Sequence, residues 1–201
     1  MTARWLVRCA SMAAGIGLAV AAAWNLREAQ AARAEPLPVY GAVPAFSLTD
    51  QHAQPISAES LRGSVWIADF IFTRCSGQCP MMAEAMRQLA QARTRRGAVQ
   101  LVSFTVDPQF DTPAVLASYA QQATAGSSAP WRFVTGDPDA IGALCRDGFH
   151  LAFGDDAGSA QEAITHSSRL VVVDEAGQIR GYYDATDAQA LEQLRRDLRR
   201  L

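Results

Sequence analysis

Apolar residues along this chain gather into short runs, each followed by a longer segment with helical periodicity. Residues 65–72 and 99–106 are almost continuously apolar, which is typical of strands buried on both faces, and residues 131–134 form a shorter run of the same kind. Capping residues and apolar spacing predict four helices, over residues 81–95, 111–121, 137–147 and 187–201. Strands that alternate with helices in this way predict parallel pairing with crossover connections.

The last third of the chain breaks this alternation. Residues 168–173 and 178–183 are predicted strands that are joined by a turn at 174–177, so they form an antiparallel hairpin. Residues 45–61 read as a short hairpin or an irregular lead-in. Together these elements predict an α/β protein of the thioredoxin-like fold, with a mixed parallel/antiparallel central sheet flanked by helices.

The first 34 residues have the pattern of an export segment. Arg4 and Arg8 precede an uncharged, mostly apolar run at 9–24, and Ala-x-Ala sequences follow at 29–31 and 32–34. The run fits a cleaved signal or a short membrane anchor, and both remain open. Either alternative places a single domain, residues 35–201, in the periplasm or on the outer face of the inner membrane. Cys9 is expected to be an incidental small residue of this segment.

The charged residues of this chain argue against several classes of function. All 18 basic residues are Arg, and residues 35–201 hold 14 of them against 19 acidic residues. Without Lys there is no Schiff-base lysine and no P-loop lysine. A mildly acidic domain is also a poor candidate for binding nucleic acid, so no such partner is expected.

Cys75 and Cys79 are the strongest chemical signal. They flank a loop of three residues between a predicted buried strand and a helix that Pro80 is expected to open. A helix N-terminus lowers the pKa of a thiol, and thiolates are soft ligands that select Cu(I). A structural disulfide and two unrelated buried cysteines remain as alternatives.

His166 is the candidate third ligand. It precedes the strand at 168–173, and if that strand runs antiparallel to 65–72, His166 lies beside the cysteines. Two thiolates and one imidazole suit copper, whereas a structural zinc site needs a fourth ligand. We expect His52 to be exposed in a polar segment and His150 to lie in the core or at its rim.

Three further features have simpler explanations beside the functional ones. Asp107 ends the second strand and either orients His166, assists deprotonation of a thiol, or only opens a turn before a proline. Cys145 is expected to be a core cysteine, with a partner thiol or an extra copper ligand as the alternative. Met81, Met82 and Met86 are expected to fill the core rather than to bind copper.

Three segments, taken together, resemble the Sco/SenC family: FIFTRCSGQCP at 70–80, VSFTVDP with DTP at 102–113, and THS with LVVVD at 165–174. The resemblance implies a thioredoxin fold, an N-terminal membrane anchor, and binding of Cu(I) and Cu(II) through Cys75, Cys79 and His166. It departs from many relatives at Phe72, where they have Tyr, and at 76–78, where they have Pro and an acid. Redox poise and docking of partners depend on this loop.

The resemblance implies copper delivery to, or thiol reduction of, the CuA site of cytochrome c oxidase. A metallochaperone would have the CuA-bearing oxidase subunit as its client and would not be an enzyme. A copper donor or a thiol reductant would be a further partner. The alternatives are a thiol–disulfide oxidoreductase that holds no copper, a peroxide-reducing enzyme that uses Arg74, and a copper sensor. The redox motif of oxidoreductases usually has two residues between the cysteines, not three.

Overall fold

The computed structural model describes residues 36–75, 77–95, 97–125, 130–151, 153–155 and 164–201, together with Trp24. For 153–155 and 164–166 only the backbone is described. The predicted export segment, Cys9 included, lies outside these residues apart from Trp24, so its role stays a prediction. Among the residues described, no helix is long and apolar enough to span a bilayer.

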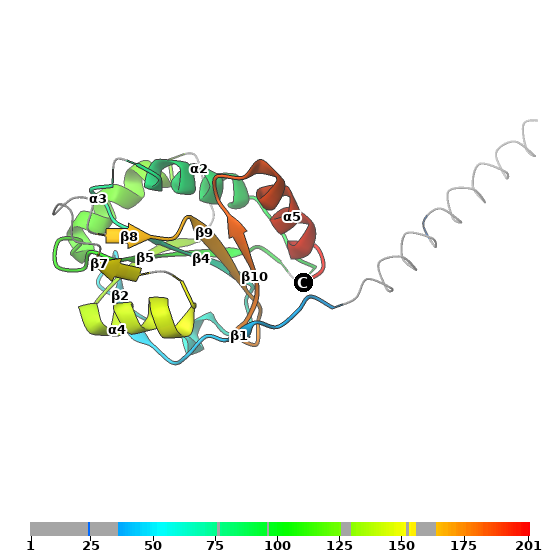
Figure 1. Ribbon diagram of the computed structural model, residues 1–201, viewed down its shortest axis with the longest axis horizontal. Coiled ribbons are helices and arrows are strands. Elements are labelled where there is room, and N and C mark those ends of the chain that lie inside the picture. Colours follow the sequence, from blue (N-terminus) through cyan, green and yellow to red (C-terminus); the bar gives the residue numbers. More distant parts are fainter. Residues whose placement is uncertain are drawn as a thin grey trace, which may run out of the picture. The chain divides into compact units, whose positions relative to one another are not determined.

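An eight-stranded mixed sheet forms the centre of the domain and confirms the predicted thioredoxin-like α/β architecture (Figure 1). Its strands are ordered β1-β10-β9-β4-β5-β6-β2-β3. They are β1 (Gly41–Ala42), β2 (Ser47–Asp50), β3 (Pro55–Ser57), β4 (Trp66–Ile71), β5 (Gln100–Thr105), β6 (Trp131–Thr135), β9 (Arg169–Val173) and β10 (Gln178–Asp184). Strands β4, β5 and β6 are parallel and β9 pairs antiparallel with β10, as the sequence predicts. β9 also pairs antiparallel with β4, which is the condition on which the placement of His166 depends.

A second, two-stranded sheet was not predicted. It pairs β7 (Phe153–Asp155) with β8 (Ile164–His166) in antiparallel register. Both strands have only three residues, which is too short for a periodic pattern to stand out in the sequence.

Helices cover both faces of the sheet. Figure 1 shows α2 and α3 on one face and α4 on the other. The helices are α2 (Cys79–Leu89), α3 (Pro113–Ala123), α4 (Pro138–Ala143) and α5 (Ala188–Leu198), with a 3₁₀ turn η1 (Glu59–Leu61) and a π turn η2 (Leu144–Gly148) that continues α4. The predicted helix 81–95 is wrong at its end, because α2 stops at Leu89 and the Ala92 carbonyl already accepts the amide of Val99 (3.5 Å), just before β5.

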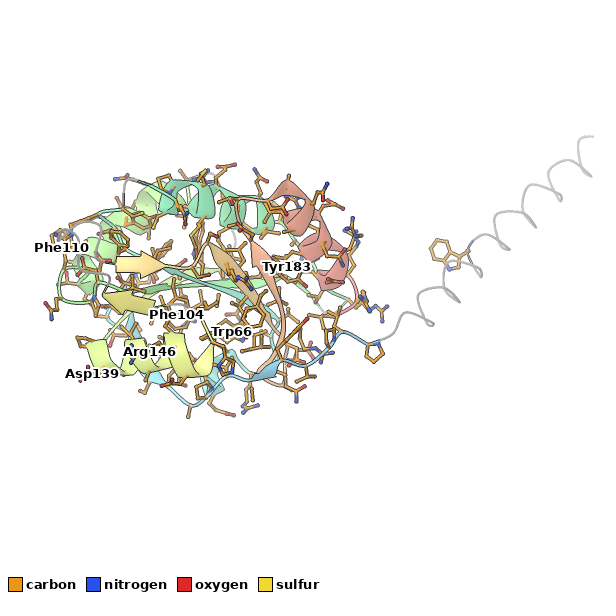
Figure 2. All side chains as sticks on the ribbon, in the orientation of Figure 1. Trp66, Phe104, Phe110, Asp139, Arg146 and Tyr183 are labelled. Atoms are coloured by element: carbon orange, nitrogen blue, oxygen red, sulfur yellow. The ribbon has the colours of Figure 1, made fainter. Side chains whose placement is uncertain are left out.

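The two faces of β4 carry different side chains. Trp66 and Phe70 point toward the α4 side, where they pack with Phe104 of β5 and with Phe149, which follows η2; the ring centroids of Phe70 and Phe104 are 5.2 Å apart. Figure 2 shows Trp66 and Phe104 in the interior of the domain and Phe110 at its periphery. Because side chains alternate along a strand, Asp69 faces the opposite layer, beneath α2 and α3.

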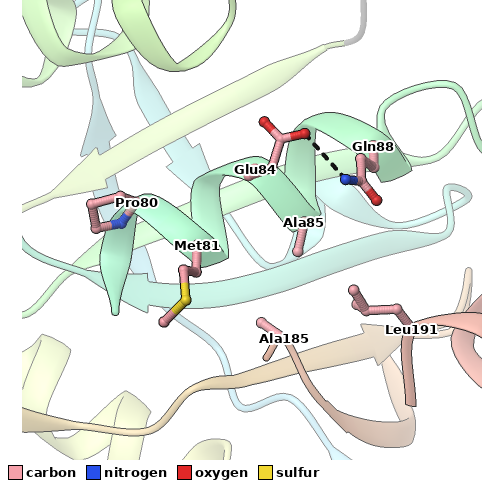
Figure 3. Close-up of a pocket in the computed structure, with 7 residues that line it drawn as sticks. All are labelled: Pro80, Met81, Glu84, Ala85, Gln88, Ala185 and Leu191. Carbon is pink, nitrogen blue, oxygen red and sulfur yellow. Dashed lines mark hydrogen bonds between the residues drawn. The ribbon is translucent and has the colours of Figure 1, made fainter. Parts of the chain in front are cut away.

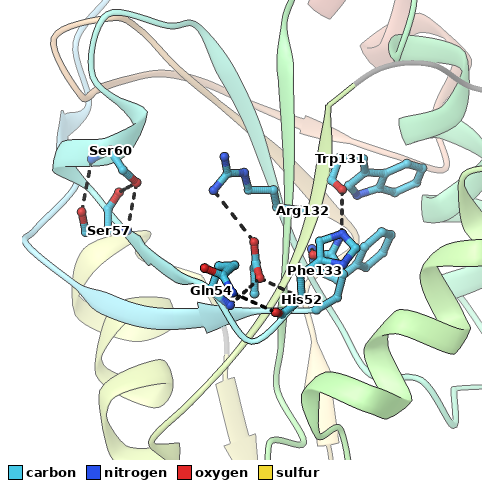
Figure 4. Close-up of polar contacts among 9 residues, drawn as sticks. His52, Gln54, Ser57, Ser60, Trp131, Arg132 and Phe133 are labelled. Atoms are coloured by element: carbon cyan, nitrogen blue, oxygen red, sulfur yellow. Dashed lines mark hydrogen bonds and ion pairs between the residues drawn. The ribbon is translucent and has the colours of Figure 1, made fainter.

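Side-chain hydrogen bonds connect the turn of the β2–β3 hairpin to β6 (Figure 4). The Gln51 side chain donates to the carbonyl of Trp131 (3.2 Å) and accepts from the amide of Phe133 (2.9 Å). His52 is exposed, as expected, and its amide donates to the carboxylate of Asp50 (2.9 Å). Since β2 runs antiparallel to β6, this turn lies near the start of β6, at the edge of the sheet away from the end of β4.

Candidate metal centre

Cys75 and Cys79 lie where β4 gives way to α2. Residues 72–75 form a tight turn in which the Cys75 amide donates to the carbonyl of Phe72 (3.2 Å). Helix α2 begins at Cys79 itself, with Pro80 inside its first turn, rather than at the predicted Met81. Cys79 is buried, Cys75 is half-buried, and the two side chains are hydrogen-bonded to each other. Two neighbouring thiols can bind one soft cation together or close a disulfide.

Cys79 does not have the lowered thiol pKa that its position at a helix N-terminus predicts. Burial raises the pKa of the Cys79 thiol far above its ordinary value, and the hydrogen bond with Cys75 raises it further. The backbone of Phe72 acts in the opposite direction, and the negative charge of Asp69 adds to the rise. Burial therefore outweighs the helix dipole, and a thiolate at Cys79 needs a bound cation to stabilise it.

A buried carboxylate fixes the turn that carries Cys75. Asp111 is fully buried in the loop before α3 and accepts hydrogen bonds from the amide of Thr73 (3.1 Å) and from the Thr73 hydroxyl. The Oδ2 atom, which accepts the Thr73 amide, also accepts from the hydroxyl of Thr105, the last residue of β5. Asp111 thus ties the turn before Cys75 to the end of the neighbouring strand.

Arg74 and Asp107 make a second connection between the same two loops. The guanidinium of Arg74 pairs with the Asp107 carboxylate (2.5 Å) and lies 4.1 Å from the ring centroid of Phe110. The structure therefore places Asp107 at the cysteine edge of the sheet but joins it to Arg74. Because Arg74 is held in this way, nothing in its geometry favours the peroxide-reducing alternative.

The segment that carries His166 enters the sheet at the same edge. β9 runs antiparallel to β4, and the predicted position of His166 beside the cysteines depends on this arrangement. His166 is the last residue of β8 and lies three residues before the start of β9. The His166 side chain lies outside the described residues. In the part of the chain whose side chains are described, no three His, Cys, Asp or Glu residues gather into a metal-binding group. Sulfur is nevertheless a soft ligand of the kind that suits copper.

The remaining candidates lie in the core or away from this edge, except for Met81. His150 is exposed with a φ of 52° and lies near Gly41 of β1, so the prediction of a core position is wrong and only the rim position holds. Cys145 is buried, as expected, and burial raises the pKa of its thiol to about 12. Met82 and Met86 are buried as expected, whereas the side chain of Met81 is exposed.

Met81 borders a shallow groove that begins next to Cys79 (Figure 3). The groove lies between α2 and the connection from β10 to α5, with a volume of about 320 Å³. Its lining is mainly apolar, from Pro80, Ala85, Ala185 and Leu191, with Glu84 and Gln88 at one side. Ala185 also donates its amide to the carbonyl of Ser168 (2.9 Å), two residues after His166.

Sequence reasoning missed two acidic residues near the cysteines. Asp111 was read only as part of a helix cap, although Thr112 caps α3 and Asp111 is buried behind it. Asp69 was passed over inside the apolar run of β4, where it is fully buried. A lone acid in such a run is the signal that could have identified it, because charged residues are almost never buried without a partner or a function.

Comparison with known proteins agrees with the resemblance seen in the sequence. A family model described as SCO1/SenC matches residues 37–201. A protein of Stutzerimonas stutzeri named "Putative copper-binding protein" is 34% identical over 74% of this chain and 72% of its own length. The SCO1 protein homolog of Bacillus subtilis (strain 168) is 39% identical over 45% of this chain. That match spans only 47% of the Bacillus subtilis protein.

Two solved structures share the fold over most of their length. A SCO1/SenC family lipoprotein from Bacillus anthracis str. Ames has a TM-score of 0.71 and 29% identity, covering 80% of this chain and 95% of its own. BsSco, described as a member of the Sco family of cytochrome c oxidase assembly proteins with a disulfide switch, has a TM-score of 0.64 and 25% identity. The latter match covers 82% of this chain and 95% of BsSco.

Proposed function

This chain belongs to the SCO1/SenC family, and from that premise we propose that it is a copper metallochaperone that binds Cu(I) and Cu(II) through Cys75, Cys79 and His166. Its client would be the subunit of cytochrome c oxidase that carries the CuA centre. The observation that carries the proposal is the hydrogen-bonded pair of thiols at the junction of β4 and α2. Soft sulfur ligands at this junction suit copper and not hard cations.

Two relatives support the choice of metal and client. The Stutzerimonas stutzeri relative is named for copper binding, and BsSco is described among the cytochrome c oxidase assembly proteins. Their names describe those proteins; for this chain, copper and the oxidase client are proposals. A dedicated copper donor or thiol reductant would be a further partner.

The protonation of Cys79 makes the binding of a cation depend on pH. Its raised pKa keeps the Cys79 thiol protonated near neutral pH, so a cation must displace this proton in order to bind the sulfur. Loading is then favoured as the pH rises, and acid favours release. A site that exchanges a proton for a cation can pass its metal to a client whose ligands are more acidic.

The proposed location follows from the predicted export segment. We infer that residues 1–34 are a signal or membrane anchor and that residues 35–201 form the copper-binding domain outside the cytoplasm, in the periplasm or on the outer face of the inner membrane. The description of the Bacillus anthracis relative as a lipoprotein supports a membrane-associated, exported protein.

Copper stoichiometry tests the proposal. The reduced protein is loaded anaerobically with Cu(I), desalted, and compared with His166→Ala; His150→Ala is a matched control, because that histidine is exposed away from the cysteine edge. We expect one copper per chain in the wild type and in His150→Ala, and a loss or a strong weakening in His166→Ala. Wild-type protein that retains little copper would reject the metallochaperone.

A thiol–disulfide oxidoreductase is the second candidate. The contact between Cys75 and Cys79 and the disulfide switch reported for BsSco favour it. This function predicts that His166→Ala keeps most of the activity toward a disulfide client, whereas Cys75→Ser and Cys79→Ser abolish it. The His166 variant thereby separates the two functions.

A further inference from the structure

Two exposed apolar side chains border the cysteine loop, and the proposed function gives them no role. In the part of the chain that the structure describes, the exposed large apolar residues are Trp24, Val39, Tyr40, Met81 and Phe110. Met81 lies in the first turn of α2, two residues after Cys79, and is 51% exposed (Figure 3). Phe110 lies in the loop after β5 and is 44% exposed (Figure 2). Because β4 and β5 are parallel, the loop of Phe110 and the cysteine loop meet at the same edge of the sheet.

The loop that presents Phe110 is ordered by its own hydrogen bonds. The Asp107 carbonyl accepts the amides of Phe110 (3.1 Å) and Asp111 (2.8 Å). The Asp107 amide donates to the hydroxyl of Thr105 (3.0 Å), and the buried carboxylate of Asp111 accepts from the turn before Cys75. A partner that covers an aromatic ring on a loop already held in place has little conformational entropy to remove.

Arg74 adds a positive charge to this surface. Its guanidinium lies 4.1 Å from the ring centroid of Phe110, and its side chain is 46% exposed. The only other charged residues in the sequence of the two loops, 72–78 and 106–112, are Asp107 and Asp111. The side chain of Asp107, which pairs with Arg74, is 12% exposed, and Asp111 is fully buried. The charge that these loops offer to a partner is therefore mainly positive.

We propose that Phe110, Arg74 and Met81 form a docking surface for a partner protein that presents an apolar patch bordered by carboxylates. The inference rests on the proposed function, which requires that a partner approach the cysteine edge. Aromatic residues, Met and Arg are enriched in protein interfaces, and clustered aromatic and Arg side chains supply a large share of the binding energy. A guanidinium has five N–H donors, so Arg74 can bind a partner's carboxylate as well as that of Asp107.

The charge of the rest of the domain makes this surface selective. Residues 35–201 hold 19 acidic residues against 14 Arg, so a partner with exposed carboxylates is repelled over much of the domain. At the Arg74 guanidinium the repulsion gives way to attraction, and the apolar side chains of Phe110 and Met81 lie at the same edge. Such a partner is therefore directed to the edge that carries the two sulfurs.

Tyr40 provides a matched control at the other end of the sheet. It is also an exposed aromatic residue, 54% exposed, and its ring contacts that of Tyr182 at a centroid distance of 5.5 Å. Its amide donates to the carbonyl of Ile179 (2.9 Å), which pairs with Val173, and Val173 pairs with Trp66 at the start of β4. The cysteines follow the opposite end of β4, so Tyr40 lies away from the proposed surface.

A binding measurement without metal tests the inference. The reduced, metal-free, full-length protein in detergent is titrated with the metal-free CuA-bearing domain of cytochrome c oxidase as the probe, and calorimetry gives the Kd. We expect Phe110→Ala to raise the Kd by about 10-fold or more, because it removes the apolar anchor. Phe110→Tyr, which keeps the ring, and Tyr40→Ala should bind as the wild type does.

The charge requirement is tested with Arg74. Arg74→Gln should weaken binding of the same probe, and Arg74→Lys should weaken it less, because it keeps the positive charge. Equal losses in these two variants would contradict the pairing of Arg74 with a partner's carboxylate.

An unchanged Kd in Phe110→Ala, an equal loss in Tyr40→Ala, or a wild type that does not bind the probe would overturn the inference. Failure of the proposed function has a different signature, because it appears as a lack of retained copper in the protein alone. Since the binding measurement contains no metal, the two hypotheses can fail separately.

Discussion

Thr73 shows how a single residue can control the geometry of the cysteine loop. Its amide and its hydroxyl both donate to the buried carboxylate of Asp111, and Cys75 follows two residues later. Thr105 donates to the same carboxylate from the end of β5, but it is not part of the cysteine loop. The two threonines thus share a partner and differ in their position relative to the sulfurs, which makes them a matched pair.

Thr73→Val is expected to weaken the metal site, whereas Thr105→Val is not. Thr73→Val removes a hydrogen bond to the buried carboxylate, and Thr105→Val removes such a bond together with the acceptor of the Asp107 amide (3.0 Å). Each substitution should therefore lower the free energy of unfolding by about 1–3 kcal/mol. Only Thr73→Val loosens the turn before Cys75, so we expect a roughly 10-fold to 100-fold loss of Cu(I) affinity in that variant alone. Competition with a Cu(I) chelator measures it. Equal affinities in the two variants would show that Thr73 is only structural.

At the scale of elements, local capping explains where the helices begin. The Asp137 carboxylate accepts from the amide of Ala140 (2.9 Å) at the start of α4, and the Thr112 hydroxyl accepts from Val115 (3.4 Å) at the start of α3. Both helices have Pro in their first turn, where no amide hydrogen is needed. Such contacts join residues only three positions apart, so the sequence reveals them before the fold is known.

Asp137→Ala should destabilise the protein by about 1 kcal/mol, because the first turn of α4 loses its capping acceptor. Chemical denaturation measures the change. Asp139→Ala is the control: Asp139 lies in the first turn of the same helix and contributes through its charge near the helix N-terminus, an effect of about 0.3–1 kcal/mol. A loss for Asp137→Ala no larger than that for Asp139→Ala would argue against the capping role.

On the scale of the whole molecule, the order of strands brings the site together. The parallel pairing of β4 and β5 places the cysteine turn and the loop at 107–111 at one edge, and antiparallel β9 delivers the segment that carries His166 to that edge. The same packing encloses Asp69 in the centre of the domain, and no cation among the described residues contributes to its pKa. The stability of the folded molecule is therefore linked to pH through a residue of its functional layer.

Asp69→Asn should make the protein more stable at neutral pH. The pKa of Asp69 is about 7 in the folded chain against 3.8 ordinarily, so between these values the folded state holds the proton that the unfolded state has lost. Wild-type stability then falls as the pH rises through this window, by on the order of 4 kcal/mol, and Asp69→Asn lacks this fall. Denaturation at pH 4 and pH 8 measures it, with Asp197→Asn as the control, because Asp197 is also buried but accepts a hydrogen bond from the Tyr183 hydroxyl (3.0 Å). Parallel pH profiles for wild type and Asp69→Asn would contradict the prediction.

The sequence by itself determined the features that depend on neighbours along the chain. The apolar runs identified β4, β5 and β6, the turn at 174–177 identified the hairpin of β9 and β10, and the spacing of Cys75 and Cys79 at the end of a strand identified the candidate site. Period, capping and turn chemistry act over a few residues, which is why these predictions needed no tertiary contacts.

Only the tertiary structure decided the environment of the sulfurs. The sequence predicted a lowered thiol pKa at the helix N-terminus, yet burial raises the pKa of Cys79, because desolvation depends on everything packed around a group. Two contacts of the cysteine loop, the ion pair of Arg74 with Asp107 and the hydrogen bonds from Thr73 to Asp111, join residues more than 30 positions apart. Such contacts and the burial of Asp69 follow from strand order and packing, which no local pattern of residues specifies.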